Sequence, residues 1–157
     1  MLDGVHRVVI RDAELADLVV VRDVFRRSSL SNDGDRAQLL VNPELLEWSS
    51  PPAGRGRTRV AVVDDAIVGF ATTTVGADCL ELDDLFVDPE SMRHGVGRAL
   101  VLDATALARD RNVVRIEVTA NEQALGFYER VGFVTRDVVD TRFGRAPRMH
   151  LDLAADG

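Results

Sequence analysis

The chain has 157 residues, 46% of them hydrophobic and 29% charged, which indicates one globular domain spanning residues 1–157. Its net charge is −7, and an acidic chain without a basic cluster is a poor nucleic-acid binder, because neutralising phosphates supplies most of that affinity. A single cysteine, with apolar runs too short for a signal peptide or a membrane span, predicts a cytoplasmic protein that does not enter a membrane.

The N-terminal part of the chain is predicted to contain one strand and three helices. Residues 8–11 form the strand. The helix after it has an apolar face made of Leu15, Leu18, Val21 and Phe25. A polar, turn-rich stretch at residues 28–36 precedes two short helices, the second capped by Asn42 with Pro43 at its first position. Residues 49–57, rich in proline and glycine, form a loop.

Strands dominate the rest of the chain. The predicted strands are residues 59–63, 66–74, 79–87, 113–119, 134–141 and 148–153, and the predicted helices are residues 98–109 and 122–131. The first two of these strands form a hairpin around Asp64-Asp65. Val114, Ile116 and Val118 alternate cleanly with polar residues. This order predicts a mixed sheet with helices on both faces.

The segment from Leu85 to Leu100 is predicted to run from a strand through a tight turn into a helix. Gly95 and Gly97 remove side chains where the backbone turns and approaches a ligand. A helix that begins there presents free N–H groups, which suit a diphosphate, and Arg93 and Arg98 add positive charge. A plain strand-to-helix turn explains the same residues equally well. A Walker-type loop needs a lysine, and the chain contains none. The Rossmann fingerprint needs a third glycine where this chain has Leu100.

A second segment follows the predicted strand at residues 113–119. Asn121 is a natural helix cap, and Gly132 ends the helix. One helix face carries Ala124, Phe127, Tyr128 and Val131. Tyr128 therefore lies on the apolar stripe, where it is either a core residue with a satisfied hydroxyl or a functional group directed at whatever that face covers.

Together the two segments resemble the GNAT superfamily of acyl-CoA-dependent N-acetyltransferases. Met92-Arg-His-Gly-Val-Gly is similar to the family's pyrophosphate loop, usually Gln/Arg-x-x-Gly-x-Gly/Ala, and Asn121-x-x-Ala-x-x-Phe-Tyr-x-x-x-Gly-Phe to its second conserved segment. Met92 departs from the pattern, so we expect weaker phosphate contact there, with binding retained. The resemblance implies a single α/β domain with a central mixed, mostly antiparallel sheet of six to seven strands, splayed parallel central strands and helices on both faces.

The resemblance also implies a site for acetyl-CoA as co-substrate. The cofactor-binding residues that it implies are Leu85, Phe86, Val87, Met92, Arg93, His94, Gly95, Val96, Gly97, Arg98, Asn121 and Phe127. The strand at residues 85–87 would pair through its backbone with the pantetheine arm. The residues add independent support for a splay. Leu80 and Leu82 have one parity before Asp83-Asp84, whereas Leu85 and Val87 have the other after it. Such a slip predicts a β-bulge of the kind found beside active sites.

Three residues are predicted to carry the chemistry implied by the resemblance. An alkylamine is mostly protonated at neutral pH, and its deprotonation costs roughly 4–5 kcal/mol. Asp83 or Asp84, directly or through a water, is the predicted base, although both could be solvated carboxylates at a strand edge. Tyr128 resembles the family's acid for the departing thiolate. A phenol is a weaker acid than a thiol, so hydrogen bonding to that thiolate is the safer expectation.

Other candidate residues concern the acceptor. Asn32, Asp35 and Arg36 lie where the family places acceptor-lining loops, although a helix cap at Asp35 and a turn at Gly34 are the simpler explanation. Residues 143–148 could cover the acceptor or form a homodimer contact. Cys79 is interpreted as a packed residue, and no spaced His/Cys cluster predicts a metal site. His6 and His150 are predicted to be solvated.

The resulting hypothesis is an N-acetyltransferase acting on a primary amine of a small molecule or a protein. Glu81, Asp83 and Asp84 would favour a cationic acceptor. A non-catalytic acyl-CoA-binding sensor or partner module of the same fold is the alternative; Met92 favours it, and the intact Asn121 and Tyr128 oppose it. A toxin that acetylates aminoacyl-tRNA is disfavoured by the acidic charge.

Overall fold

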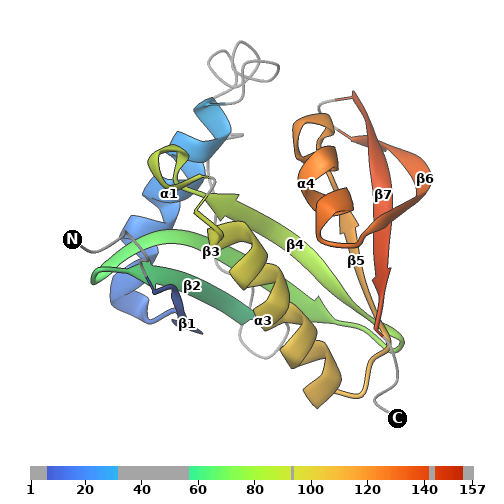
Figure 1. Cartoon of the computed structure of the whole chain (residues 1–157), viewed down its shortest axis with the longest axis horizontal. Helices are drawn as coiled ribbons and strands as arrows, with labels where there is room; N and C mark the ends of the chain where they lie inside the picture. The colour runs from blue at the N-terminus through green and yellow to red at the C-terminus, as the bar shows by residue number, and fades with distance from the viewer. Residues whose placement is uncertain (1–6, 32–56, 93, 142–143, 154–157) are drawn as a thin grey trace.

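The computed structural model describes residues 7–31, 57–92, 94–141 and 144–153, which form one seven-stranded sheet with helices on both faces (Figure 1). The strands are β1 (Val9–Asp12), β2 (Arg57–Val63), β3 (Ala66–Val75), β4 (Cys79–Val87), β5 (Arg115–Thr119), β6 (Val134–Thr141) and β7 (Gly144–Asp152). The sheet order is β1-β2-β3-β4-β5-β7-β6, and only β4 and β5 run parallel. The predicted mixed, mostly antiparallel sheet is therefore confirmed.

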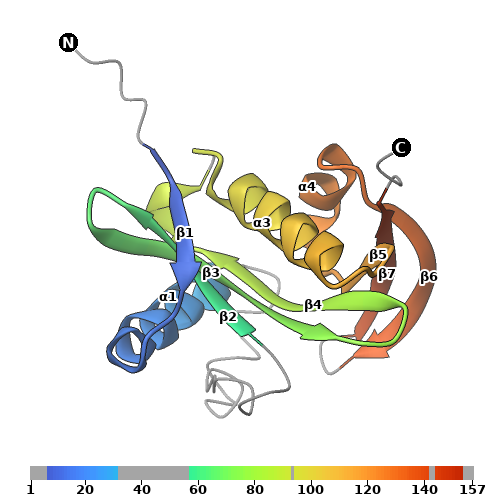
Figure 2. The ribbon, with the colours of Figure 1, turned by 90° about the horizontal axis from the view of Figure 1, so that it is seen from below.

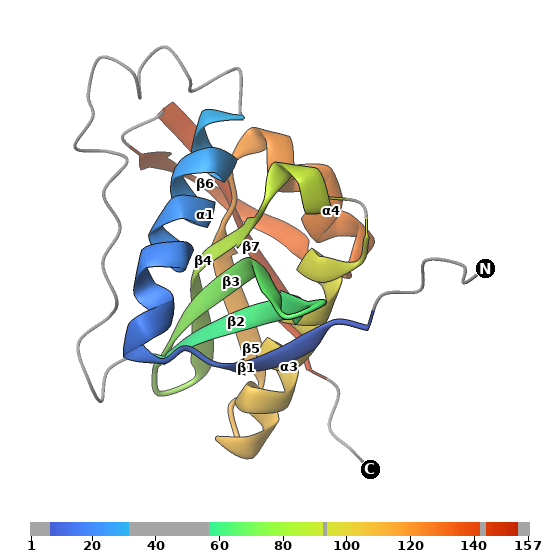
Figure 3. The ribbon, with the colours of Figure 1, turned by 90° about the vertical axis from the view of Figure 1, so that its left-hand side faces the viewer.

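Helices cover both faces of this sheet. They are η1 (Leu15–Asp17), α1 (Leu18–Leu30), η3 (Pro89–Ser91), α3 (Val96–Asp110), η4 (Glu122–Ala124) and α4 (Leu125–Arg130). Figures 2 and 3 show α1 on one face, and α3 with α4 on the other. None of the helices in the described ranges is both long and apolar enough to cross a bilayer.

Each face has its own apolar core. On the α3 side the buried cluster includes Leu80, Leu82, Leu100, Ala104, Ile116, Val118 and Met149. On the α1 side it consists of Val21, Val24, Val60 and Phe70. The alternation of side chains along each strand supplies both cores from the same strands, so neither face of the central sheet can be left open.

The N-terminal helix differs from its prediction in two respects. Leu15 is 85% exposed, whereas Val24 is fully buried. Leu15 lies in the 3-10 turn η1 rather than in α1, and the change from 3.0 to 3.6 residues per turn breaks the expected spacing. The helix also continues to Leu30, so the start of the predicted polar stretch at residues 28–36 is helical. The two short helices predicted with Asn42 and Pro43 lie outside the described residues.

The strand predictions hold with shifted ends. The hairpin around Asp64 and Asp65 is confirmed, with φ values of 50° and 65° that match the turn favoured between twisted strands. Strand β2 begins at Arg57, so the predicted loop ends earlier, and β7 begins at Gly144 rather than at residue 148. Val114 precedes β5 and is exposed, so the predicted alternation holds only within the strand itself.

Candidate functional site

The two parallel strands in the middle of the sheet separate partway along their length. Strand β4 pairs with β3 from Leu80 to Val87, but with β5 only from Cys79 to Leu82. Figure 1 shows β4 and β5 diverging from this shared segment. Beyond Leu82, no strand in the described ranges pairs with the β5-facing edge of β4. The splay expected from the family resemblance is thus present.

A bulge in β4 coincides with the start of the splay. Leu82 lies opposite Thr73, and Asp84 lies opposite Thr72, which leaves Asp83 as an additional residue between them. The bulge keeps Leu82 and Leu85 on the same core although they are three residues apart; in a regular strand they would face opposite sides. The predicted slip at Asp83-Asp84 is confirmed.

The two aspartates at the bulge accept hydrogen bonds from threonines of β3. Thr72 Oγ1 donates to Asp84 Oδ2 at 2.5 Å, and Thr74 Oγ1 donates to Asp83 Oδ2 at 2.7 Å. Loss of hydration raises the pKa of Asp83, the bond from Thr74 opposes the rise, and the negative charges of Glu81 and Asp84 add to it. A carboxylate with a raised pKa accepts a proton more readily than an ordinary one.

Tyr128 lies on α4, the helix that follows β5 and the 3-10 turn η4. It is only 5% exposed, and its ring packs edge to face against Phe127 and Phe133, with centroids 5.2 Å apart in both pairs. Burial raises the pKa of its phenol, and the negative charge of Asp84 raises it further. Tyr128 and Asp84 therefore interact electrostatically. A raised phenol pKa makes proton donation harder, which favours a hydrogen-bonding role for this group.

The loop after β4 is held by a residue that sequence reasoning missed. Asp88 is buried, and its Oδ1 accepts a hydrogen bond from the Glu90 N–H at 3.1 Å, which caps η3. Its Oδ2 pairs with Arg27 Nη1 of α1 at 2.5 Å. An aspartate directly before a proline is a helix-start signal that could have identified the cap. The partner, Arg27, carries no comparable signal.

The glycine turn leads into α3, and its two glycines serve different purposes. Gly95 has φ of 80°, which favours glycine, and a Cβ there would meet no atom within 4 Å. At Gly97 a Cβ would lie 3.0 Å from Cζ of Phe127. Gly95 thus permits the turn, whereas Gly97 permits α3 to pack on α4. The helix begins at Val96 rather than at the predicted residue 98, and its N-cap residue is Gly95, which makes no side-chain capping hydrogen bond.

The second predicted segment forms two short elements rather than one helix. Asn121 Oδ1 accepts a hydrogen bond from the Ala124 N–H at 2.8 Å, so the predicted cap is confirmed, but it opens the 3-10 turn η4. The α-helix α4 then covers only Leu125–Arg130. Gly132 follows with φ of 108°, as expected for the residue after a helix end.

With this geometry in place, the comparisons with known proteins are decisive. A family model described as Acetyltransferase (GNAT) family matches residues 18–133. The chain belongs to the GNAT family. Peptidyl-lysine N-acetyltransferase YjaB of Salmonella typhimurium (strain LT2) is 34% identical over 108 residues, which cover 68% of this chain and 70% of that protein.

Other relatives of this GNAT chain differ in length and sequence. Mycothiol acetyltransferase of Rhodococcus jostii (strain RHA1) is 29% identical over 163 residues, covering 86% of this chain and 53% of that protein. The first three curated relatives are matched over only 35%, 53% and 34% of their own lengths. The PaiA N-acetyltransferase from Thermoplasma acidophilum, solved in complex with coenzyme A, has a TM-score of 0.70 at 20% identity, with 93% of this chain and 99% of that chain covered. This likeness shows the fold.

The residues expected to bind the GNAT cofactor are mostly described. Met92, His94 and Arg98 are exposed around the start of α3. The side chain of Val96 is buried, and Phe86 packs between Phe25 and Phe70, so these two could serve a ligand only through their backbone. Arg93 and the predicted acceptor residues Asn32, Asp35 and Arg36 lie outside the described residues.

Three further expectations concern residues away from this GNAT site. His150 is not solvated as predicted, because its side chain is 20% exposed and its Nδ1 is buried without a hydrogen-bond partner among the described residues; His6 lies outside them. Burial raises the pKa of Cys79, which fits a packed, protonated thiol. Within the described ranges, no group of histidine, cysteine and acidic side chains has a metal-binding arrangement.

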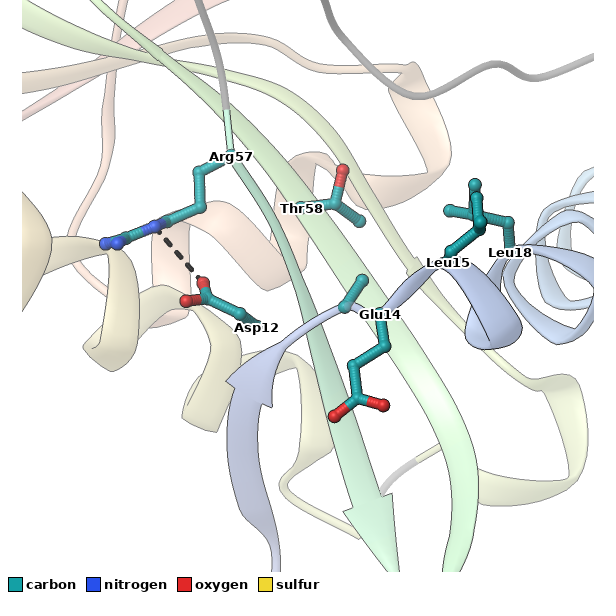
Figure 4. A pocket seen from close by; sticks show the side chains of 7 residues that line it. Asp12, Glu14, Leu15, Leu18, Arg57 and Thr58 are labelled. Carbon is teal, nitrogen blue, oxygen red and sulfur yellow. Dashed lines mark ion pairs between the residues drawn. The ribbon is translucent and has the colours of Figure 1, made fainter. Parts of the chain in front are cut away.

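A hollow elsewhere on the surface is unrelated to the GNAT site. It measures about 420 Å³ and lies between β1, the η1–α1 start and β2 (Figure 4). Its lining residues are Asp12, Ala13, Glu14, Leu15, Leu18, Arg57 and Thr58. Arg57 Nε and Asp12 Oδ1 form an ion pair of 3.1 Å at its edge. None of the predicted catalytic or cofactor-binding residues is among these lining residues.

Proposed function

We propose that this protein is an N-acetyltransferase that moves an acetyl group from acetyl-CoA to a primary amine by direct attack. The observation that carries the proposal is that Asp84, at the point where β4 parts from β5, interacts electrostatically with the buried Tyr128 of α4. A carboxylate and a phenol from different elements there could serve the two ends of one transfer reaction. The acceptor is a small-molecule or protein amine, since the relatives above are named for peptidyl-lysine and for mycothiol.

Two backbone features of the structure fit acetyl-CoA. Asp88 donates its N–H to the Val68 carbonyl on β3. Alternation along an antiparallel pair then directs the backbone groups of Leu85 and Val87 away from β3, toward the splay. At the start of α3 the N-cap residue, Gly95, makes no side-chain capping hydrogen bond to the first N–H groups, and it leaves open space beside them. We assign the pantetheine to the first feature and the diphosphate to the second.

Around the start of α3, other side chains complete the proposed cofactor site. Arg98 contributes positive charge to the diphosphate, and exposed Met92 and His94 border it. Phe127 supports the turn by packing on Gly97. Asn121 fixes the start of the segment that carries Tyr128, through its bond to Ala124.

The thioester of acetyl-CoA supplies an activated carbonyl carbon, at which a C–N bond forms as the C–S bond breaks. Asp83 accepts the proton that the attacking amine must lose, directly or through a water, because its raised pKa suits this task. Asp84 balances the positive charge on the nitrogen. Tyr128 donates a hydrogen bond to the sulfur that leaves with the electron pair.

The proposal is tested by calorimetry with coenzyme A, followed by thiol release from acetyl-CoA with a panel of primary amines. We expect binding, and thiol release matched one to one by acetylated amine. Binding with no release from any amine would make the protein a non-catalytic acyl-CoA-binding module. Absence of binding would overturn the site altogether. Asp83→Asn and Asp84→Asn then separate the two carboxylates, because only loss of the base should remove the acidic limb of the pH profile.

A further inference from the structure

Two carboxylates lie side by side where β4 and β5 are about to separate. Glu81 of β4 and Glu117 of β5 are direct partners in the parallel pair, one position before the last pair, Leu82 and Val118. Both belong to the strand positions that alternate with the buried Leu80 and Ile116, so they share the face opposite α3. Like charges on adjacent strands repel and weaken the pairing there.

Arg148 of β7 bridges the two carboxylates, and its hydrogen bonds join side chains from three strands. Its Nη1 donates to Glu81 Oε2 at 2.6 Å and to Thr119 Oγ1 at 3.0 Å. Its Nη2 donates to Glu81 Oε1 at 2.5 Å and to Glu117 Oε1 at 3.3 Å. The Arg148, Glu81 and Glu117 side chains are 24%, 31% and 15% exposed, and a bidentate pair that is partly shielded from water is stronger than a surface ion pair.

Glu117 is held in its charged form by its other neighbours. Burial opposes its ionisation, but hydrogen bonds from Arg115 and Cys79 and the charges of Arg115 and Arg148 outweigh burial, so the pKa of Glu117 is lowered. Arg115 Nε lies 3.0 Å from Glu117 Oε2. The charges of Glu81, Glu117, Arg115 and Arg148 sum to zero. Glu81 was predicted from the sequence to attract a cationic acceptor, but because its charge is balanced it adds little to that attraction.

We propose that Arg148 is a positioning residue for acetyl transfer, which clamps β4 to β5 through Glu81 and Glu117 and fixes the point where the two strands separate. The inference rests on the proposed function. Without Arg148 the two carboxylates push the strands apart, and the splay extends back past Leu82. Asp84 then moves relative to Tyr128, while the diphosphate site at the start of α3 is left intact.

Hydrogen exchange on the full chain tests the clamp without any need for catalysis. In Arg148→Met, amides of residues 80–82 and 116–118 should exchange at least about tenfold faster, because their pairing opens locally, while amides of β2 stay unchanged. Arg145→Met is the matched control on the same strand, since its pair with Asp140 is 3.9 Å long and highly exposed. Unchanged exchange at residues 80–82 and 116–118 in Arg148→Met would overturn the clamp.

A triple variant distinguishes the loss of charge balance from a general destabilisation of the fold. The triple variant Arg148→Met/Glu81→Gln/Glu117→Gln removes both the repelling carboxylates and the arginine that bridges them. Its amide exchange rates should return to within about threefold of those of the wild type. A triple variant as open as the single one would refute the electrostatic account. Should Arg148→Met fail to fold, Arg148→Lys replaces it, because lysine keeps the charge but loses the fork; faster exchange at the same amides is again expected.

The kinetic arm connects the clamp to the reaction. Arg148→Met should lower kcat about tenfold, because small displacements of reacting groups are costly, while the Kd for coenzyme A stays within about threefold. Equal loss of affinity and turnover would refute a positioning role. If the wild-type protein releases no thiol with any amine, the proposed function fails, yet the exchange results still decide whether the clamp exists.

Discussion

The two halves of β4 belong to one continuous strand and yet have opposite surroundings. Residues 79–82 are flanked by β3 and β5, and their acidic residue, Glu81, is neutralised by Arg148. Residues 83–87 are flanked by β3 alone among the described strands, and Asp83 has only the Thr74 hydroxyl as a hydrogen-bond donor from β3. Acidic residues of one strand thus have a structural role where a partner strand and a counter-charge are present, and in the proposed function they are reactive where both are missing.

Tyr128→Phe should have the largest effect on turnover at the proposed site beside residues 83–87. Loss of the hydroxyl removes a hydrogen bond to the charge that develops in the transition state, and we expect turnover to fall about 100-fold. The ring contacts with Phe127 and Phe133 remain, so the Kd for coenzyme A and the Tm should hardly change. Thiol release measures the first and calorimetry the second. Turnover within twofold of the wild type would remove Tyr128 from the mechanism.

Asp88→Ala should loosen the loop that continues the reactive half. The change removes the η3 cap and leaves Arg27 without its closest carboxylate, which should lower the free energy of unfolding by about 2 kcal/mol. Urea denaturation measures it. Glu90→Ala is the control, because only the backbone N–H of Glu90 takes part in the cap. Similar stability of the two variants would mean that Asp88 does not anchor the loop.

Gly97→Ala should disturb the contact between α3 and α4. The added methyl group would lie 3.0 Å from the Phe127 ring, and we expect a cost of about 1 kcal/mol in the free energy of unfolding, with weaker coenzyme A binding. At Gly126 the nearest atom is the flexible end of Arg130, so Gly126→Ala should stabilise α4 by roughly 0.5 kcal/mol. Shifts of the same sign in both variants would contradict the packing role of Gly97.

Asp83→Asn should raise the stability of the folded protein slightly. The folded pKa of Asp83 is raised above its ordinary value of 3.8, so the native state loses stability as the pH rises from 3.8 through that raised pKa, and the penalty persists at neutral pH. Water screens this exposed group, which keeps the gain small. The Tm difference between variant and wild type should therefore be larger at pH 7 than at pH 3. A lower Tm at pH 7 would show that the carboxylate stabilises the fold.

Local signals predicted much of the fold and part of the site. The hairpin at Asp64-Asp65, the bounds of β4, its bulge and the cap at Asn121 all follow from turn residues and side-chain alternation over a few positions. These features depend on the chain's immediate neighbourhood, so a single sequence can report them. The roles assigned to Asp83 and Tyr128 stay predictions.

Features that depend on tertiary contacts escaped prediction. Arg148 meets Glu81 across 67 positions of the chain, and Arg27 of α1 meets Asp88 in the loop after β4. Nothing in the local pattern distinguishes these arginines from the others. The predicted burial of Leu15 was wrong for a different reason. Leu15 lies in a 3-10 turn, which does not follow the helical period on which the prediction was based. Long-range charge pairing and local changes of helix type are therefore what one sequence leaves open.

The electrostatic interaction between Asp84 and Tyr128 also bears on product release. In the proposed reaction the departing coenzyme A carries a thiolate, and this anion would form within the field of the Asp84 carboxylate. Like charges in a partly dehydrated site repel, so the hydrogen bond from Tyr128 need only stabilise the sulfur for the moment of bond cleavage. In the proposed reaction the Asp84 charge would thus attract an incoming ammonium group and repel the coenzyme A thiolate after the transfer. Because free coenzyme A is a thiolate at alkaline pH, it would inhibit turnover least there.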